Sequence, residues 1–359
     1  MNVISLFSGA GGLDLGLEMA GLHTCLCIEI DFDARATLAL NRPQWNPTAV
    51  HAGDITAFSS DEVLELAGLR AEEVDLVAGG PPCQSFSNLG RKGGLSDARG
   101  SLIFHYLRII EAVRPRYCLF ENVEGLLQHP KAVRELGDQF EAIGYAFALK
   151  LVNAADFGVP QVRRRVIGIG ARDLAFVPFP RPTHSREGSR GSGLRRWVTV
   201  RQAFSNLPKG YRARSDNMGM RHADYMIRRM AKVRVGENFR ALSPRDLPDC
   251  WKNGRHQGVD TFGRLDPLRP SVTIRTSGFN PTKGRYIHPF EDRGLSTLEM
   301  ACLQGFPYEW RFVGRIGSVG RQIGNAVPPL LAMQIGSALL QPETAERSVT
   351  REMTLFGAA

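Results

Sequence analysis

The sequence predicts an α/β fold with a mainly parallel sheet, together with a smaller, irregular and basic segment. Residues 3–7 have the apolar pattern of a strand, and the glycine-rich turn at 8–12 leads into a helical pattern. A second buried strand is predicted at 74–78, immediately before a turn of two glycines and two prolines. Residues 181–255 contain 18 Lys and Arg against 6 Asp and Glu, so all of the excess positive charge lies there.

The first strand–turn–helix unit predicts a nucleotide-type ligand site. Its glycines let the backbone and the helix N-terminus approach a ligand closely. Glu29 follows Gly11 by eighteen residues, near the usual spacing of an acid that accepts from ribose hydroxyls. Asp54 could present a carboxylate to an adenine amino group, although turns of this kind are common. Because the Gly-x-Gly-x-x-Gly pattern of dinucleotide sites is missing, an adenosyl ligand is favoured over NAD.

The second strand would hold Cys83 at its carboxyl end. Gly79 and Gly80 let the backbone turn, and the two prolines that follow stiffen it. In open parallel sheets ligands bind outside the carboxyl ends of strands. A thiol in that position is a candidate nucleophile, since sulfur attacks as its thiolate. The alternative is an ordinary buried cysteine near a proline-rich turn.

Two further stretches bring charged side chains to the predicted sheet. Glu121 follows the apolar run 117–120, at the same edge as Cys83, and is either capped by backbone amides or catalytic. Residues 161–169 alternate polar and apolar side chains, which places Gln161, Arg163 and Arg165 on one face of a strand. These three could bind substrate oxygens or hold a loop, or they could belong to a solvated edge strand.

Composition bounds the class of protein. With 359 residues and 43% hydrophobic content, the chain can bury a sizeable core. No apolar run approaches the roughly 20 residues of a membrane helix, and the N-terminus has no basic leader. The six cysteines include no Cys-x-x-Cys pair and no zinc-spaced His cluster, so we expect reduced thiols, no metal site and a cytoplasmic location.

The basic segment is typical of polyanion binding, because Lys and Arg displace counterions from phosphates. Arg228, Arg229, Lys232 and Arg234 could form a basic helical surface or a solvated face. The predicted division is a catalytic and cofactor-binding domain at 1–180, a recognition domain at 181–295, a return segment at 296–342 and a loose tail at 343–359.

Taken together, these stretches resemble the DNA (cytosine-5) methyltransferases of the compact bacterial or phage restriction-modification type. The resemblance spans nearly the whole chain except the basic segment, and its eight motifs occur in the family order. They lie at 7–12, 53–55, 81–84, 99–100, 121–123, 161–165, 303–307 and 324–327.

The resemblance implies a Rossmann-like fold that binds S-adenosylmethionine. Glu29 would take the ribose hydroxyls, Ile30 would pack on adenine, and Asp54 with Ile55 would contact the adenine edge. Many family members carry a tryptophan where Ile30 stands, which suggests weaker stacking here. The remaining residues that motif position assigns to the cofactor are Phe7, Gly9, Ala10, Gly11, Gly12, Gly80, Leu102, Asn325 and Ala326.

The resemblance also implies covalent catalysis on a flipped cytosine. Cys83 would add to C6, Glu121 would stabilise charge developing at N3, and Arg165 would bind O2. Arg163 would support the cysteine loop. The segment 87–99 would close as a lid behind the base.

Duplex DNA is the implied partner, with a restriction endonuclease as a possible companion and a monomer as the expected state. The residues expected to contact DNA are Ser87, Arg99, Arg228, Arg229 and Lys232. Three alternatives stay open at this point: methylation of tRNA cytosine, a catalytically silent DNA-binding homologue, and an NAD-dependent oxidoreductase. The long basic segment favours DNA over tRNA, and Cys83, Glu121 and Arg165 argue against a silent protein.

Overall fold

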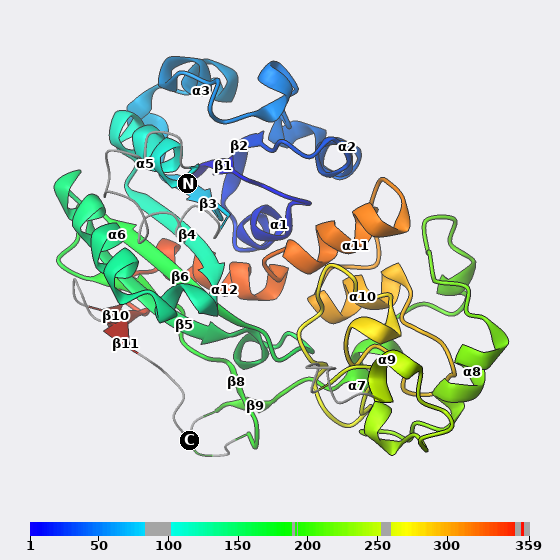
Figure 1. The fold of residues 1–359 in the computed structure, drawn as a ribbon. Helices are drawn as coiled ribbons and strands as arrows, with labels where there is room; N and C mark the ends of the chain where they lie inside the picture. The colour runs from blue at the N-terminus through cyan, green and yellow to red at the C-terminus, as the bar shows by residue number, and fades with distance from the viewer. Residues whose placement is uncertain (83–101, 189–190, 192, 253–259, 349–352, 355–359) are drawn as a thin grey trace. The chain divides into compact units, whose positions relative to one another are not determined.

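The computed structural model describes residues 1–82, 102–188, 191, 193–252, 260–348 and 353–354 (Figure 1). The chain divides into two compact units. Unit 1 comprises Met1–Phe157, Arg164–Thr183 and Val327–Ala359, and unit 2 comprises Gly158–Arg163 and His184–Ala326. The chain therefore returns to the first unit at residue 327, whereas the sequence predicted this return at 296.

Unit 1 is built on a sheet that, within the described residues, has seven strands in the order β11-β5-β6-β4-β3-β1-β2. The strands β2, β1, β3 and β4 are parallel to one another, and β6 runs antiparallel between β4 and β5. The predicted α/β fold with a mainly parallel sheet is confirmed. The strands of this sheet are β1 (Asn2–Leu6), β2 (His23–Ile28), β3 (Leu76–Gly79), β4 (Tyr117–Val123), β5 (Ala146–Asn153), β6 (Arg164–Ala171) and β11 (Met353–Thr354).

The strand order creates a switch point beside β1. From β1 the chain moves to β2 on one side and later to β3 on the other. In open α/β sheets the connections diverge at such a point, and ligands bind outside the carboxyl ends of the strands there. In this chain those ends are Leu6 and Gly79, which precede the glycine-rich turn and the approach to Cys83.

Helices cover both faces of the sheet. Side chains such as Ile4, Val77 and Phe120 pack with α5 and α6 in one core, and their alternate neighbours, such as Val3 and Leu119, are buried too. The helices α1 and α12 lie side by side (Figure 1). The helices of unit 1 are α1 (Gly12–Met19), α2 (Phe32–Asn41), α3 (Ser60–Ala67), α5 (Leu102–Val113), α6 (Pro130–Ala142) and α12 (Pro329–Leu340).

A glycine permits the close approach of α1 and α12. A Cβ atom at Gly16 would lie 2.3 Å from the carbonyl oxygen of Pro329 and 2.4 Å from the Cβ of Ala332. No larger residue fits there unless the two helices separate. This contact fixes the C-terminal helix against the helix that follows the glycine-rich turn.

One segment, Ile316–Leu340, is long and apolar enough by composition to cross a membrane, which corrects the expectation from the sequence. It consists of two helices, α11 (Ile316–Asn325) and α12, with Pro328 as the N-cap of the second. In its most apolar 18-residue window, 67% of the residues are buried inside the protein. The apolar side chains of this segment therefore pack largely against the protein itself.

Three local expectations were wrong. Glu121 lies within β4 rather than after its end. The strand β6 begins at Arg164 and is flanked on both sides, so the edge-strand interpretation fails. The tail after 342 is not loose throughout, because β10 (Glu346–Ser348) pairs antiparallel with β7 (Val177–Phe179), and Lys150 Nζ lies 2.7 Å from Glu346 Oε1.

Unit 2 has little regular sheet. One cluster of its buried apolar side chains contains Met230, Val233, Phe239, Leu242, Phe262 and Ile287. Its helices and strands in the described residues are β8 (His184–Ser185), β9 (Arg195–Arg196), α7 (Val200–Ser205), α8 (Asp224–Ala231), α9 (Asp249–Lys252), α10 (Thr297–Gln304) and α11.

Unit 2 also contains a buried ionic network around Glu299. Glu299 of α10 is fully buried, and its carboxylate lies 2.6 and 2.8 Å from the guanidinium nitrogens of Arg293 and accepts from the Tyr211 hydroxyl. It also accepts from the backbone N–H of Ser296, which caps α10. Burial opposes ionisation, but the hydrogen bonds and charge of Arg293 outweigh it and lower the pKa of Glu299 to about 2.

We expect Glu299→Gln to destabilise unit 2 by about 1–3 kcal/mol at neutral pH, since it removes the charge of the buried carboxylate, while the partly exposed Arg293 keeps its ion pair with Glu291. The pKa of Glu299 is lower in the folded chain than its ordinary value of 4.5. The ion pair therefore stabilises above about pH 4.5, and its contribution is lost as the pH falls toward 2. Denaturant unfolding followed by tryptophan fluorescence at pH 7 and pH 4 measures both effects. The exposed variant Glu309→Gln is the control, and an unchanged unfolding midpoint for Glu299→Gln would contradict the prediction.

Candidate active site

The carboxyl ends of four neighbouring strands of unit 1 carry the predicted site residues. The glycine-rich turn follows β1, Glu29 follows β2, Gly80 follows β3, and Glu121 lies near the end of β4 (Figure 1). Parallel strands end at the same sheet edge, so these residues share one side of the molecule. Cys83, Ser87 and Arg99 lie outside the described residues.

The glycine-rich turn is held by the carboxylate of Glu29. The Gly9 N–H donates to Glu29 Oε2 at 2.7 Å, and the Asp31 N–H donates to Oε1 at 2.8 Å. Burial raises the pKa of Glu29, although these two hydrogen bonds partly oppose that rise. Each carboxylate oxygen can accept a further hydrogen bond. Glu29 can therefore bind the turn and a ligand hydroxyl at the same time.

The backbone of this turn adopts left-handed conformations. Gly9 and Gly11 have φ values of 57° and 78°, which glycine accepts at no steric cost. Phe7 also has a positive φ, 57°, which is strained for an aromatic residue. Such strain persists where the surrounding structure holds it and is common at ligand sites. A Cβ atom at Gly9 would meet no atom within 4 Å, so the space beside this glycine is open.

Arg35 joins the Glu29 loop to the turn that carries Asp54. Its Nη1 lies 2.7 Å from the Glu29 carbonyl oxygen, 2.8 Å from that of Ile30 and 2.6 Å from that of Ala52. The sequence analysis did not single out Arg35, because an arginine in the first turns of a helix carries no motif signal. The structure thus brings the loops of three predicted cofactor residues together through a residue that sequence reasoning missed.

Gly53 brings the Asp54 turn directly against Glu29. A Cβ atom at Gly53 would lie 1.9 Å from the Glu29 carbonyl oxygen, and its φ is +74°. Asp54 accepts from the backbone N–H and the hydroxyl of Thr56, and these two hydrogen bonds lower its pKa. Its carboxylate is therefore an oriented acceptor beside Ile30, whose side chain is 64% exposed.

Other predicted cofactor residues belong to the core. The side chains of Ala10 and Ile55 are buried, so a ligand would meet chiefly their backbone. Phe7 and Leu102 are partly buried and pack against the main core of unit 1. Gly12 is the first residue of α1. The side chains at these positions pack into the protein beside the turn and do not project freely from it.

The approach to Cys83 is fixed beside Glu121. Asn122 is buried, and its side-chain amide donates to the Pro81 carbonyl oxygen at 3.0 Å. A Cβ atom at Gly80 would lie 3.2 Å from Glu121 Oε2, tighter than most such contacts. Glycine at this position therefore leaves room beside Oε2.

The other oxygen of Glu121 faces Arg165. The Arg165 Nε lies 3.0 Å from Glu121 Oε1, and the two side chains are only 14% and 12% exposed. Arg165 is opposite Val123 in the β4–β6 pairing, which makes it a diagonal neighbour of Glu121 on the same face. Burial lowers the pKa of Arg165, and the Glu121 charge opposes that shift. The result is an oriented pair of opposite charges at the sheet edge.

Gln161 and Arg163 hold loops of unit 2. The Arg163 guanidinium donates to the carbonyl oxygens of Ile274, Gly324 and Ala326 at 3.2, 2.8 and 3.0 Å. Gln161 donates to the Leu303 carbonyl oxygen, and its own side-chain oxygen accepts from Ile274 N. The sequence left open whether these residues bind substrate oxygens or hold a loop. The contacts of Gln161 and Arg163 are those of residues that hold a loop.

The Arg163 contacts fix the backbone on either side of Asn325. Gln304 Nε2 adds a hydrogen bond of 2.6 Å to the Ala326 carbonyl oxygen. Ala326 is buried, whereas Asn325 is exposed at the end of α11. Of the predicted cofactor residues in unit 2, Asn325 is the one with an accessible side chain.

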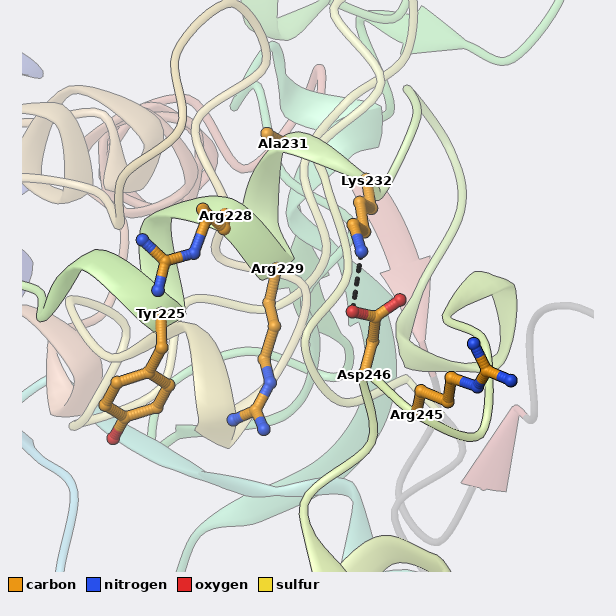
Figure 2. Close-up of a pocket in the computed structure, with 7 residues that line it drawn as sticks. All are labelled: Tyr225, Arg228, Arg229, Ala231, Lys232, Arg245 and Asp246. Carbon is orange, nitrogen blue, oxygen red and sulfur yellow. Dashed lines mark hydrogen bonds and ion pairs between the residues drawn. The ribbon is translucent and has the colours of Figure 1, made fainter.

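The predicted DNA-contacting cations lie at the end of α8 and just after it. Arg228, Arg229 and Lys232 line a hollow of about 390 Å³ (Figure 2). Tyr225 of the same helix and Arg245 and Asp246 of a following turn line it too. The sequence did not predict that these two segments meet.

A buried carboxyl lies in α1, one turn beyond the glycine-rich loop. Asp14 is fully buried, and neither of its oxygens has a hydrogen-bond partner in the described part of the chain. Burial raises the pKa of Asp14 to about 6, and the nearby Ser5 hydroxyl offsets only part of that rise. Burial also raises the pKa of the neighbouring Cys27 thiol.

Comparisons with known proteins agree with this geometry. Residues 1–341 match the C-5 cytosine-specific DNA methylase family. The chain is 33% identical to the Type II methyltransferase M1.HphI of Haemophilus parahaemolyticus over 96% of this chain and 88% of that protein. It is 35% identical to the Type II methyltransferase M.NgoFVII of Neisseria gonorrhoeae, over 94% of this chain and 86% of that protein.

Two solved structures have a similar fold. One is a putative DNA modification methyltransferase encoded within an Escherichia coli prophage, with a TM-score of 0.69 and 24% identity over 95% of this chain and 99% of that one. The other is the Dnmt2 methyltransferase of S. pombe, with a TM-score of 0.64 and 16% identity over 96% of this chain and 99% of that one. At these identities the likeness supports the fold alone.

We expect Asp14→Asn to stabilise the protein above pH 6 by up to about 3 kcal/mol. The folded pKa of Asp14, about 6, exceeds the ordinary 3.8, so the wild type loses stability as the pH rises through this range. The amide cannot ionise, and the loss should disappear. Urea unfolding from pH 4.5 to pH 8 tests this, with Asp61→Asn, an exposed first-turn acid of α3, as the control. A stability difference between Asp14→Asn and wild type that does not change with pH would contradict the prediction.

Proposed function

Because the chain belongs to the C-5 cytosine-specific DNA methylase family, we propose that it transfers the methyl group of S-adenosylmethionine to C5 of a cytosine in a specific duplex DNA sequence. The observation that carries the proposal is the Glu121–Arg165 pair beside the Gly80–Pro81 approach to Cys83. A carboxyl and a guanidinium at the end of β4, with a cysteine next in the chain after Pro82, suit addition to a pyrimidine ring.

The donor set of the glycine-rich turn fits an adenosyl cofactor. Glu29 has acceptor capacity left for ribose hydroxyls, Ile30 offers an exposed apolar face to adenine, and the oriented Asp54 carboxylate can accept from the adenine amino group. The open space at Gly9 accommodates close backbone approach. Bound S-adenosylmethionine would supply an electrophilic methyl group. Asn325 and Ala326 stay predicted contributors by motif position.

Cys83 would begin the reaction, because C5 of cytosine is a poor nucleophile until its ring is activated. The Cys83 thiolate would form a bond to C6, and Glu121 would protonate or share a proton with N3, which raises electron density at C5. C5 would then attack the methyl group, whose bond to the sulfonium would break with S-adenosylhomocysteine as the leaving group. The C5 proton would leave to a base, and the bond from the Cys83 sulfur to C6 would break. The base must be flipped out of the duplex for Cys83 to reach C6.

Arg165 would orient Glu121 and bind O2, the carbonyl oxygen on C2 of cytosine. Its Nε holds one carboxylate oxygen, Oε1, while Oε2 faces the space left by Gly80. This arrangement directs one oxygen of Glu121 toward a ring nitrogen. Arg163 would act as a positioning residue, because its hydrogen bonds hold the backbone on either side of Asn325.

The proposal extends to the setting of the enzyme. The curated relatives are named as Type II methyltransferases, a name that fits a chain acting on DNA in the cytoplasm beside a companion restriction endonuclease. We propose a monomer, since one chain carries all the motif residues.

We expect the wild type to protect cytosines of unmethylated plasmid DNA in one short sequence context, read by bisulfite sequencing after incubation with S-adenosylmethionine. Cys83→Ala should lower methyl transfer by about 10³-fold or more, since the nucleophile is removed. Cys25→Ala, which removes a thiol outside the site, is the matched control. Full transfer by Cys83→Ala would refute the nucleophile assignment. Transfer by the wild type to tRNA but not to DNA would favour the RNA alternative.

We expect Arg35→Gln to weaken S-adenosylmethionine binding by about tenfold, because the loops of Glu29 and Asp54 lose their shared donor. Isothermal titration calorimetry with S-adenosylmethionine measures the affinity, and steady-state kinetics should show a raised KM for the cofactor with a smaller change in kcat. Arg70→Gln, which removes an exposed ion pair of the same unit, should behave as wild type. Equal affinities for Arg35→Gln and wild type would count against the positioning role.

A further inference from the structure

The hollow at the end of α8 gathers charge from two segments of unit 2. Arg228, Arg229 and Lys232 come from α8 and the residue after it, and Arg245 and Asp246 come from a turn that follows (Figure 2). Four cations and one anion therefore line a cavity of about 390 Å³. This volume is ample for a phosphate group with attached sugar.

The position of these cations on a helix explains only part of the cluster. Cations in the last turn of a helix are favoured by its dipole, which accounts for Arg228 and Arg229. Arg245 belongs to no helix and still faces the same hollow. Among the residues that the structure describes, neither the Arg228 side chain nor the Arg245 side chain has a hydrogen bond or an ion pair. Two guanidinium groups at the margins of the cavity are thus uncommitted.

Arg229 contacts the ring of Tyr225. Its guanidinium carbon lies 5.1 Å from the centroid of the Tyr225 ring, a cation–π distance. Figure 2 shows Arg229 extending between the Tyr225 ring and Asp246. A guanidinium placed against a ring still presents N–H donors, and its planar fork matches phosphate oxygens. The Tyr225 side chain, 53% exposed, also offers a flat apolar surface at the edge of the hollow.

Asp246 occupies the place that an anion would take. Lys232 Nζ lies 2.6 Å from Asp246 Oδ1, and the Ser243 hydroxyl donates to Oδ2 at 2.7 Å. The carboxylate satisfies the lysine in the absence of ligand and repels an incoming anion. Removing its charge should therefore strengthen anion binding, whereas removing a cation should weaken it.

We propose that this hollow binds a backbone phosphate of the DNA strand, with donors from Arg229, Arg228 and Arg245, and with Asp246 limiting the affinity. The proposal rests on the proposed function for its source of phosphate. Free inorganic phosphate shares the same chemistry, so the test separates the two sources.

The test measures duplex binding by fluorescence anisotropy between 50 and 300 mM salt, using a labelled oligonucleotide that contains the methylated sequence. Arg229→Gln and Arg245→Gln should each weaken binding about three- to tenfold and reduce the slope of log K against log salt by about 1, as loss of one phosphate contact does. Asp246→Asn should tighten binding about threefold or more. Arg186→Gln is the matched control, since it removes one exposed cation from the same unit outside the hollow.

Opposite effects of Asp246→Asn and Arg245→Gln, with Arg186→Gln as wild type, support the site. Affinities and slopes equal to those of Arg186→Gln in all three variants overturn it. A parallel titration with inorganic phosphate distinguishes the sources, because variants that change phosphate binding but not duplex binding would reassign the hollow to a free anion and overturn the DNA assignment. If the wild type methylates DNA while the variants match the control, this proposal fails and the proposed function stands.

Discussion

The hydrogen bonds of the Glu29 carboxylate connect the loops on which the site depends. One oxygen accepts from Gly9 after β1 and the other from Asp31 before α2. Arg35 then ties the backbone of the same loop to the turn that carries Asp54. Because a buried acid is costly unless it is satisfied, these bonds make the loops of two adjacent strands interdependent. The cofactor end of the site is therefore a single hydrogen-bonded assembly.

The Glu121–Arg165 pair serves orientation more than stability. A buried ion pair recovers little net free energy, because desolvation of both groups offsets their attraction. What the pair does provide is a fixed direction for each carboxylate oxygen, with Oε1 on Arg165 and Oε2 beside Gly80. The antiparallel pairing of β6 with β4 supplies this geometry, since it sets Arg165 diagonal to Glu121. The strand β6, which is reversed relative to the parallel strands of the sheet, thus places a cation at the edge where those strands end.

The sequence predicted what local pattern determines and missed what depends on distant contacts. The strand before Cys83, the glycine-rich turn and Glu29 were visible because their spacing is short and their residue types have few uses. The Arg35 contacts were not, since its three acceptors belong to loops set by tertiary packing. The sequence also did not show that Gln161 and Arg165 make different kinds of contact. Alternation correctly separated the buried positions from exposed Arg164, but not loop-holding Gln161 from Arg165, which meets Glu121.

Charge counting overstates the surface that unit 2 offers to an anion. Several of its arginines bind groups of the protein itself. Arg264 donates to the carbonyl oxygens of Val233 and Met230, and Arg293 neutralises Glu299. Such cations satisfy buried carbonyl and carboxylate groups. Arg228 and Arg245 are among the cations of unit 2 whose side chains have no hydrogen bond or ion pair in the described part of the chain, and both line the same hollow. A cation can contact a phosphate when its side chain is not already paired within the protein. Only the folded chain shows which members of a basic segment meet this condition.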